Sequence, residues 1–269
     1  MVMLAQLVWL SIAWGGPFPP AADEFGSSAI SKDAADFQFW ASGYLSYMVG
    51  EKVDPIWQDP DKSLGPAEGT SFDIVSLGRG GSIILTFDAP IQNGDGWDFA
   101  VFENSFSDQY IELAFVEVSS DGIDYVRFDA VSRTNTPVPG FGNIDPTDVD
   151  GLAGKYRQGF GTPFDLNVLA NKSEVLSGNV DLMQIAYIRI IDIVGDGSNL
   201  DSQGNPIYDP YPTAGSAGFD LDGIGVSNGA AYPAGYNQYV EPDMPSEDDD
   251  AGFGGDQGCF IGSLSELTL

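Results

Sequence analysis

The sequence predicts an all-β fold, an antiparallel β-sandwich, and three observations carry this prediction. Short apolar segments recur along the chain, several with alternating hydrophobicity, and Asp-Gly pairs typical of tight turns occur at Asp95, Asp121 and Asp222. The 269 residues include 34 glycines and 17 prolines, which indicates many turns rather than long helices. Apolar residues make up 43 %, enough for a core. We therefore expect one domain over residues 30–228, an antiparallel sandwich or jelly roll with long loops.

The first element that we expect is a helix from about Lys32 to Val49, with Ser31 as its N-cap and Gly50 at its end. Its apolar positions fall at i, i+3, i+4, i+7, i+8 and i+11: Phe37, Trp40, Ala41, Tyr44, Leu45 and Met48. Such a stripe favours an amphipathic helix that packs on the domain, and a helix that binds a partner is the alternative.

The strands follow as short runs rich in β-branched and aromatic residues. Ser119 to Gly122 has the composition of a hairpin turn, and Asp165 is placed to cap a short helix through Ala170. In the run 181–194 apolar residues occupy both faces, which indicates a strand covered on both sides. The expected strands lie at 71–78, 82–87, 97–104, 111–119, 124–128, 181–194 and 219–226. The loops at 133–181 and 195–218 are long enough to suggest a function or an ordering metal.

The charge of the chain limits its partners. It carries 40 Asp and Glu against 10 Lys and Arg, a formal net charge of −30. This balance disfavours nucleic acid and anionic membrane surfaces, which bind basic patches. With no histidine and one cysteine, the chain has no His/Cys zinc site, no Ser-His-Asp or Cys-His catalytic group and no internal disulfide.

The two ends of the chain have compositions unlike the domain. Residues 1–22 contain an apolar run at 4–14, too short to span a bilayer and followed by Gly, Pro and Ala, as in a secretory signal; a buried strand is the alternative. Residues 229–258 are rich in Pro, Gly and acidic groups and read as a flexible linker, and 259–269 form a tail. We expect export to the surface of a bacterium, without a direct membrane span.

Three segments resemble the galactose-binding-like, discoidin-type jelly roll: Ser76 to Phe87, Val116 to Tyr125, and Phe219 to Val226. Further segments, at 98–104, 152–157 and 218–226, resemble secreted bacterial cell-surface proteins. The first resemblance implies glycan or surface binding and a structural Ca²⁺ near the final strand, where Asp220 and Asp222 match. Gly258-Cys-Phe-Ile261 resembles a bacterial Cys-Phe-Ile sorting segment, which implies processing at Cys259; a free thiol is the alternative.

Acidic residues beside apolar strands form the predicted calcium site. Buried carboxylates are costly unless they are paired or bind a cation, and this chain has few cationic side chains. Calcium accepts about six to eight oxygen ligands, so glycine-rich turns can add carbonyls. The alternative is that these carboxylates accept backbone N–H groups or lie in solvent. The predicted ligands are Asp98, Glu103, Asn104, Asp220, Asp222 and Asp192, with Asp196 of lower rank.

A second candidate site combines cationic and aromatic side chains: Lys155, Tyr156, Arg157 and Phe160. Such a group could hold an acidic sugar by charge and ring stacking. The favoured alternative is that Lys155 and Arg157 pair with Asp148, Asp150 or Asp165 and fasten the loop.

Taken together, these features favour a calcium-stabilised surface module that binds a carbohydrate or another surface polymer. A carbohydrate-active hydrolase or lyase is the enzyme alternative, and it requires two carboxylates facing each other across a cleft. The third hypothesis is that the protein is a structural subunit of a surface layer or filament.

Overall fold

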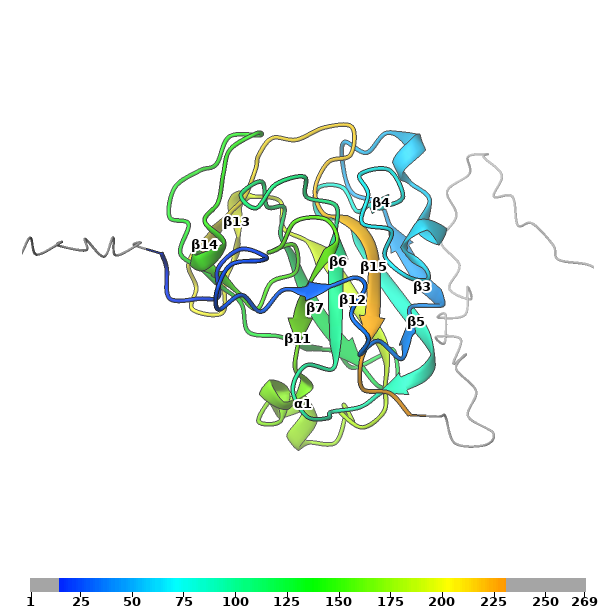
Figure 1. Ribbon diagram of the computed structural model, residues 1–269. Coiled ribbons are helices and arrows are strands. Elements are labelled where there is room, and N and C mark those ends of the chain that lie inside the picture. Colours follow the sequence, from blue (N-terminus) through cyan, green and yellow to red (C-terminus); the bar gives the residue numbers. More distant parts are fainter. Residues whose placement is uncertain (1–14, 231–269) are drawn as a thin grey trace, which may run out of the picture.

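The computed structural model describes residues 15–230, and it is an all-β, sandwich-like fold built of two antiparallel sheets (Figure 1). The first sheet has the order β1 (Ile30–Ser31), β11 (Phe160–Phe164), β6 (Phe99–Glu103), β15 (Asp220–Val226) and β2 (Phe39–Trp40), and β4 (Val75–Ser76) also pairs with β15. The second sheet has the order β3 (Gly43–Met48), β5 (Ser82–Ile91), β12 (Ile185–Asp192), β7 (Ala114–Ser119) and β8 (Val126–Arg127).

The remaining elements are short and lie in the connections. Two small ribbons are made by β9 (Val131–Ser132) with β10 (Val149–Asp150), and by β13 (Asp196–Leu200) with β14 (Pro206–Tyr208). The 3₁₀ turns are η1 (Pro55–Trp57), η2 (Pro60–Ser63), η3 (Pro146–Asp148) and η4 (Leu166–Leu169), and α1 (Ser173–Leu176) is a single helical turn. Between residues 15 and 230, no helix has the length and apolar character needed to cross a membrane.

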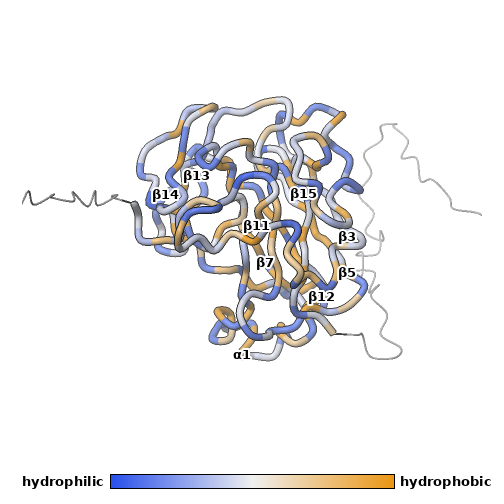
Figure 2. The backbone as a smooth tube through the Cα atoms, viewed as in Figure 1, coloured by the Kyte–Doolittle hydropathy of each residue, from blue (hydrophilic) through white to orange (hydrophobic). Residues whose placement is uncertain are grey.

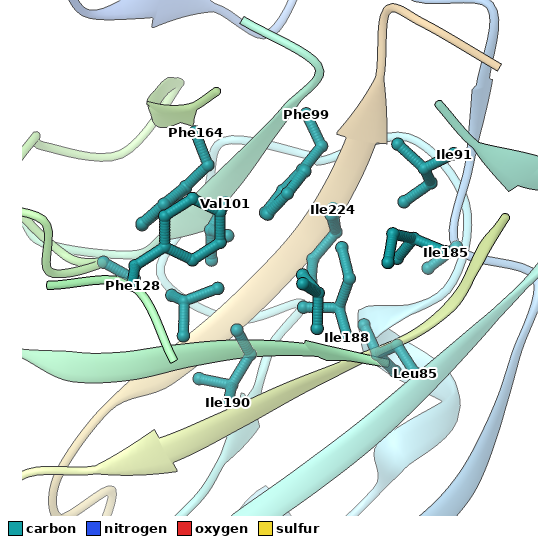
Figure 3. Close-up of a cluster of buried hydrophobic side chains, with 14 of the residues drawn as sticks. Leu85, Ile91, Phe99, Val101, Phe128, Phe164, Ile185, Ile188, Ile190 and Ile224 are labelled. Atoms are coloured by element: carbon teal, nitrogen blue, oxygen red, sulfur yellow. The ribbon is translucent and has the colours of Figure 1, made fainter. Parts of the chain in front are cut away.

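The main core lies between the two sheets (Figure 3). Phe99 of β6 stacks on Phe164 of β11 with ring centroids 5.3 Å apart and meets Phe128 edge-on at 5.9 Å. Ile188 and Ile190 of β12 face this cluster from the second sheet. Figure 2 shows hydrophobic residues along the central strands and many hydrophilic residues in the surrounding loops. Burial between sheets therefore accounts for the alternating patterns of the sequence.

The outer face of the first sheet is also covered. Phe102 of β6 contacts the rings of Phe37 and Trp40, with centroids 5.8 and 5.4 Å away. Ala67 and Ala100 complete this small cluster. Since both faces of β6 and β15 are covered, all residues of these two strands are buried, the acidic ones included.

The predicted helix at 32–49 is wrong, because this segment forms β2 and β3 instead. β3 is an edge strand that pairs with β5, with Met48 opposite Ser82. A Cβ on Gly43 would lie 2.8 Å from the Oγ1 atom of Thr86, so the strand pairing depends on glycine there. Aromatic residues suit strands as well as helices, and the available edge of β5 decided between them.

The predicted turns and caps are mostly confirmed. Asp121 and Gly122 form the hairpin turn between β7 and β8, and Gly122 has a φ of 78°. Asp165 caps a 3₁₀ turn by accepting the N–H of Asn167. The Asp222-Gly223 pair is an exception, because it lies inside β15 rather than in a turn.

The predicted terminal segments fall largely outside the described residues. Residues 1–14 of the signal segment, 231–258 of the linker and the tail 259–269 are outside them. Residues 15–22 pack on the domain: the N–H of Phe18 donates to the carbonyl of Thr147, and Ala21 and Ala22 are buried. At the other end, the N–H of Ala230 donates to the carbonyl of Pro90.

Candidate functional site: an acidic cavity with an aromatic wall

Three of the predicted calcium ligands have structural partners instead. Asp98 accepts the N–H groups of Gly94 and Leu166, at 2.8 and 2.7 Å. Asp192 accepts those of Gly80 and Phe219, and Asp222 accepts those of Glu68 and Gly69. Both oxygens of each carboxylate are thus used to fasten backbone, which is the alternative considered for these residues.

The other three predicted ligands come together at one end of the sandwich. Glu103 ends β6 and is followed by Asn104, while Asp220 begins the antiparallel neighbour β15, where Leu221 pairs with Glu103. Figure 1 shows this end of β15 at the top, opposite α1. Antiparallel pairing therefore brings together acidic residues that are more than a hundred positions apart in the chain.

A third acidic residue, Glu112, belongs to this group and was not predicted. It lies two residues before β7, within an apolar run in which every neighbour is buried. The backbone around Gly154 packs closely against this position, because a Cβ on Gly154 would lie 1.9 Å from the carbonyl oxygen of Glu112. The available signal in the sequence was an acidic residue inside an apolar run, a signal that Glu117 of the same run shares although it pairs with Arg127 and Arg189.

Glu103, Glu112 and Asp220, here called the acidic triad, are buried with incomplete hydrogen bonding. They are 1 %, 4 % and 2 % exposed. One oxygen of Glu103 accepts the N–H of Ser105, but its other oxygen, Oε1 of Glu112 and Oδ1 of Asp220 have no partner. Buried polar atoms in proteins are rarely left without a hydrogen-bond partner, so we expect the triad to bind a further group.

Burial raises the pKa of each carboxyl in the triad, and repulsion between carboxylates adds to this effect at Glu103 and Glu112. Burial raises the pKa of Asp220 to about 7, and the polar side chains of Ser76, Ser216 and Asn104 offset only part of this effect. The pKa of Glu112 lies well above its usual value because of burial and then the charges of Asp220 and Glu103. Burial and then the charge of Asp220 raise the pKa of Glu103 as well. The triad therefore disfavours three negative charges unless a positive group is added.

Glu112 and Asp220 line a cavity of about 380 Å³. Its wall contains three aromatic rings in a row: Phe106 stacks on Tyr110 at 4.6 Å, and Tyr110 faces Phe141 at 6.4 Å. Phe106 is 65 % exposed and Phe141 is 88 % exposed. The remaining lining residues are Ser71, Asn104, Pro212, Thr213, Ala214 and Ser216, so the lining has no lysine or arginine.

The calcium prediction has mixed support from this arrangement. The unpartnered oxygens are of the type that calcium prefers. Across residues 15–230, however, no three His, Cys, Asp or Glu side chains are gathered closely enough to hold a metal ion. Glu112 and Asp220 line a wide cavity, which Glu103 does not line, so calcium binding stays a prediction that these side-chain positions do not favour.

The predicted ligand group Lys155, Tyr156, Arg157 and Phe160 is largely engaged within the fold. Lys155 is buried and donates a hydrogen bond to the carbonyl of Val149 at 2.8 Å, and the hydroxyl of Tyr156 is hydrogen-bonded to the hydroxyl of Ser28. Arg157 pairs with Asp23 at 2.6 Å and with Asp108 at 2.7 Å, and its guanidinium lies over the ring of Phe160.

These contacts fasten the loop, but not through Asp148, Asp150 or Asp165: Lys155 bonds to a backbone carbonyl, and Arg157 pairs with Asp23 and Asp108. Burial lowers the pKa of Lys155 to about 8, opposed by the charges of Asp150 and Asp145. None of the four residues lines the acidic cavity.

The chain matches no protein-family model and no curated protein, and its fold matches no solved structure.

Proposed function

We propose that this chain is an exported bacterial cell-surface protein whose domain, a sandwich of jelly-roll type, binds a carbohydrate in the acidic cavity. The observation that carries the proposal is the exposed row of Phe106, Tyr110 and Phe141 beside polar lining groups. Large apolar side chains left open to water at a cavity typically mark a binding site.

The cavity offers what a sugar ring requires. The flat faces of the aromatic row can cover the C–H face of a sugar, while Asn104, Ser216 and the carboxylates of Glu112 and Asp220 can accept or donate hydrogen bonds to hydroxyl groups. Its volume of about 380 Å³ lies within the range of small-ligand pockets, roughly 300–1,000 Å³. A polar site with a few aromatic contacts favours moderate affinity and release of the ligand.

Export and surface display are supported by the sequence: the apolar run at 4–14, the net charge of −30 and the acidic, glycine-rich segment after residue 229.

A glycan-array screen followed by isothermal titration of the strongest ligand tests this proposal. Phe141→Ala is expected to weaken binding at least about fivefold, because one ring stacked on an aromatic side chain is typically worth about 1–3 kcal/mol. Phe25→Ala is the matched control, since Phe25 is also fully exposed but does not line the cavity. Equal loss in both variants, or no glycan bound by the wild type, would contradict the proposal.

A second candidate function is hydrolysis of a glycoside, and the observation that favours it is specific. Two carboxyl groups, Glu112 and Asp220, line the same cavity, and the raised pKa of each suits proton donation near neutral pH. Release of reducing sugar from a bound oligosaccharide, abolished in Glu112→Gln while binding persists, would identify the protein as an enzyme.

A further inference from the structure

We propose that the ligand of the acidic cavity carries a protonated amine, so that within the carbohydrate-binding role, on which this inference rests, the preferred ligand is an amino sugar. Three observations lead to this assignment: the charge of the cavity, the incomplete bonding of its carboxylates, and the shape of the space that they border.

The cavity is acidic, and its lining contains no cationic side chain. Glu112 and Asp220 are in its lining, Glu103 lies beside them, and no lysine or arginine is among the lining residues. Arg79 lies next to this region, where it donates to the carbonyl of Thr213 and its guanidinium lies over the ring of Tyr211. A ligand with a positive charge would be attracted, and an acidic sugar would be repelled.

The carboxylates have acceptor capacity that the protein does not use. Each member of the triad is at least nine-tenths buried and has an oxygen without a hydrogen-bond partner. A primary ammonium group has a positive charge and three N–H donors, so it can bond to free carboxylate oxygens at the cavity wall. A neutral hydroxyl brings a single donor and no charge, and would leave most of the repulsion within the triad in place.

The space suits an organic cation better than a bare metal ion. A cavity of about 380 Å³ is roughly ten times the 30 Å³ share of one water molecule, and no gathered set of metal ligands occurs within residues 15–230. The faces of Phe106, Tyr110 and Phe141 also attract cations through their ring quadrupoles. One molecule that joins an ammonium group to a sugar ring can thus use the carboxylates and the aromatic row together.

The raised pKa values of the triad supply a signature of this binding mode. Part of the triad is protonated near neutral pH in the free protein, and an arriving ammonium group favours the ionised carboxylates. Binding should therefore release protons. A neutral sugar bound on the aromatic row alone would release none.

The test is a titration of the full chain with four single-molecule probes: glucosamine, N-acetylglucosamine, ethanolamine and calcium chloride. Measurements at about pH 6.5 keep the amines protonated, and about 0.15 M salt screens general attraction to the acidic surface. We expect glucosamine to bind at least tenfold more tightly than N-acetylglucosamine, with a heat that depends on the buffer because protons are released.

Glu112→Gln is expected to remove the preference for glucosamine, while Asp95→Asn, which removes an exposed charge outside the cavity, leaves it unchanged. Thermal melting of both variants checks that they are folded. Glutamine has the shape of glutamate, so retention of binding to N-acetylglucosamine in Glu112→Gln would further show that the cavity is intact.

The outcomes separate this inference from the proposed function. Equal binding of the two sugars would overturn the amine assignment and leave carbohydrate binding standing. Binding of ethanolamine without either sugar would support the amine assignment and overturn the carbohydrate role. Calcium binding that Glu112→Gln abolishes and that excludes glucosamine would overturn the assignment in favour of a metal site, and no binding of any probe would overturn both proposals.

Discussion

Replacing Asp220 by asparagine should stabilise the ligand-free protein at alkaline pH and have little effect in acid. Asp220 is 2 % exposed, and burial raises its pKa from 3.8 to about 7. A carboxyl whose pKa is raised on folding contributes stability below its unfolded pKa and loses it as the pH rises through the folded pKa. The wild type should therefore lose stability between about pH 4 and pH 7, and asparagine, which cannot ionise, should not.

The size of the effect follows from the same values. Each pH unit between the unfolded and folded pKa corresponds to about 1.4 kcal/mol, so the difference between 3.8 and about 7 corresponds to an upper limit of about 4 kcal/mol. The charge of Asp220 also repels Glu103 and Glu112, so the contributions of the three residues to stability are not additive. We expect Asp220→Asn to raise the free energy of unfolding by about 2–4 kcal/mol at pH 8.

Urea unfolding of wild type and Asp220→Asn at about pH 4 and pH 8 measures this difference. The free energies of unfolding should agree at the lower pH and diverge at the higher one. A variant that is less stable than wild type at pH 8 would refute the reasoning, because it would show that the Asp220 charge has a favourable partner within the fold.

The remaining predictions concern features outside the cavity. Asp201→Asn should cost about 1–3 kcal/mol at neutral pH, because Asp201 accepts the N–H groups of Ser132, Gln203 and Asn205. These bonds and others hold the pKa of Asp201 below its usual value despite burial, so its contribution is present above the unfolded pKa and is lost as the pH falls through the folded one; a cost that persists in strong acid would contradict this. Phe99→Ala should lower the free energy of unfolding by about 3–5 kcal/mol, since Phe99 is fully buried between Phe128 and Phe164. Phe25→Ala, at a fully exposed ring, should stay within about 0.5 kcal/mol of wild type in the same denaturation assay, and a large loss there would show that exposure does not govern these costs.

The tertiary structure also decided which acidic motifs are structural and which form the cavity. Asp98 and Asp220 both lie at the start of a buried strand, and nothing in their local sequences tells them apart. Asp98 accepts the N–H of Leu166, 68 residues away, whereas the charge of Asp220 acts on the carboxyls of Glu103 and Glu112. The partner of a buried charge depends on the residues around it in three dimensions. The sequence could therefore indicate that the six predicted ligands need a cation or a hydrogen-bond donor, but not which of them has a donor within the fold.

By itself the sequence determined the all-β class, most strand positions, the hairpin turn at Asp121-Gly122 and the acidic surface, because alternation, turn chemistry and net charge are local or additive properties. Only the tertiary structure decided that residues 32–49 are strands, since the free edge of β5 outweighed a helical spacing of apolar residues. It also brought Glu112 to Asp220 and aligned Phe106, Tyr110 and Phe141 over them. Contacts between residues far apart in the chain arise from sheet pairing and loop packing, and no short segment encodes them.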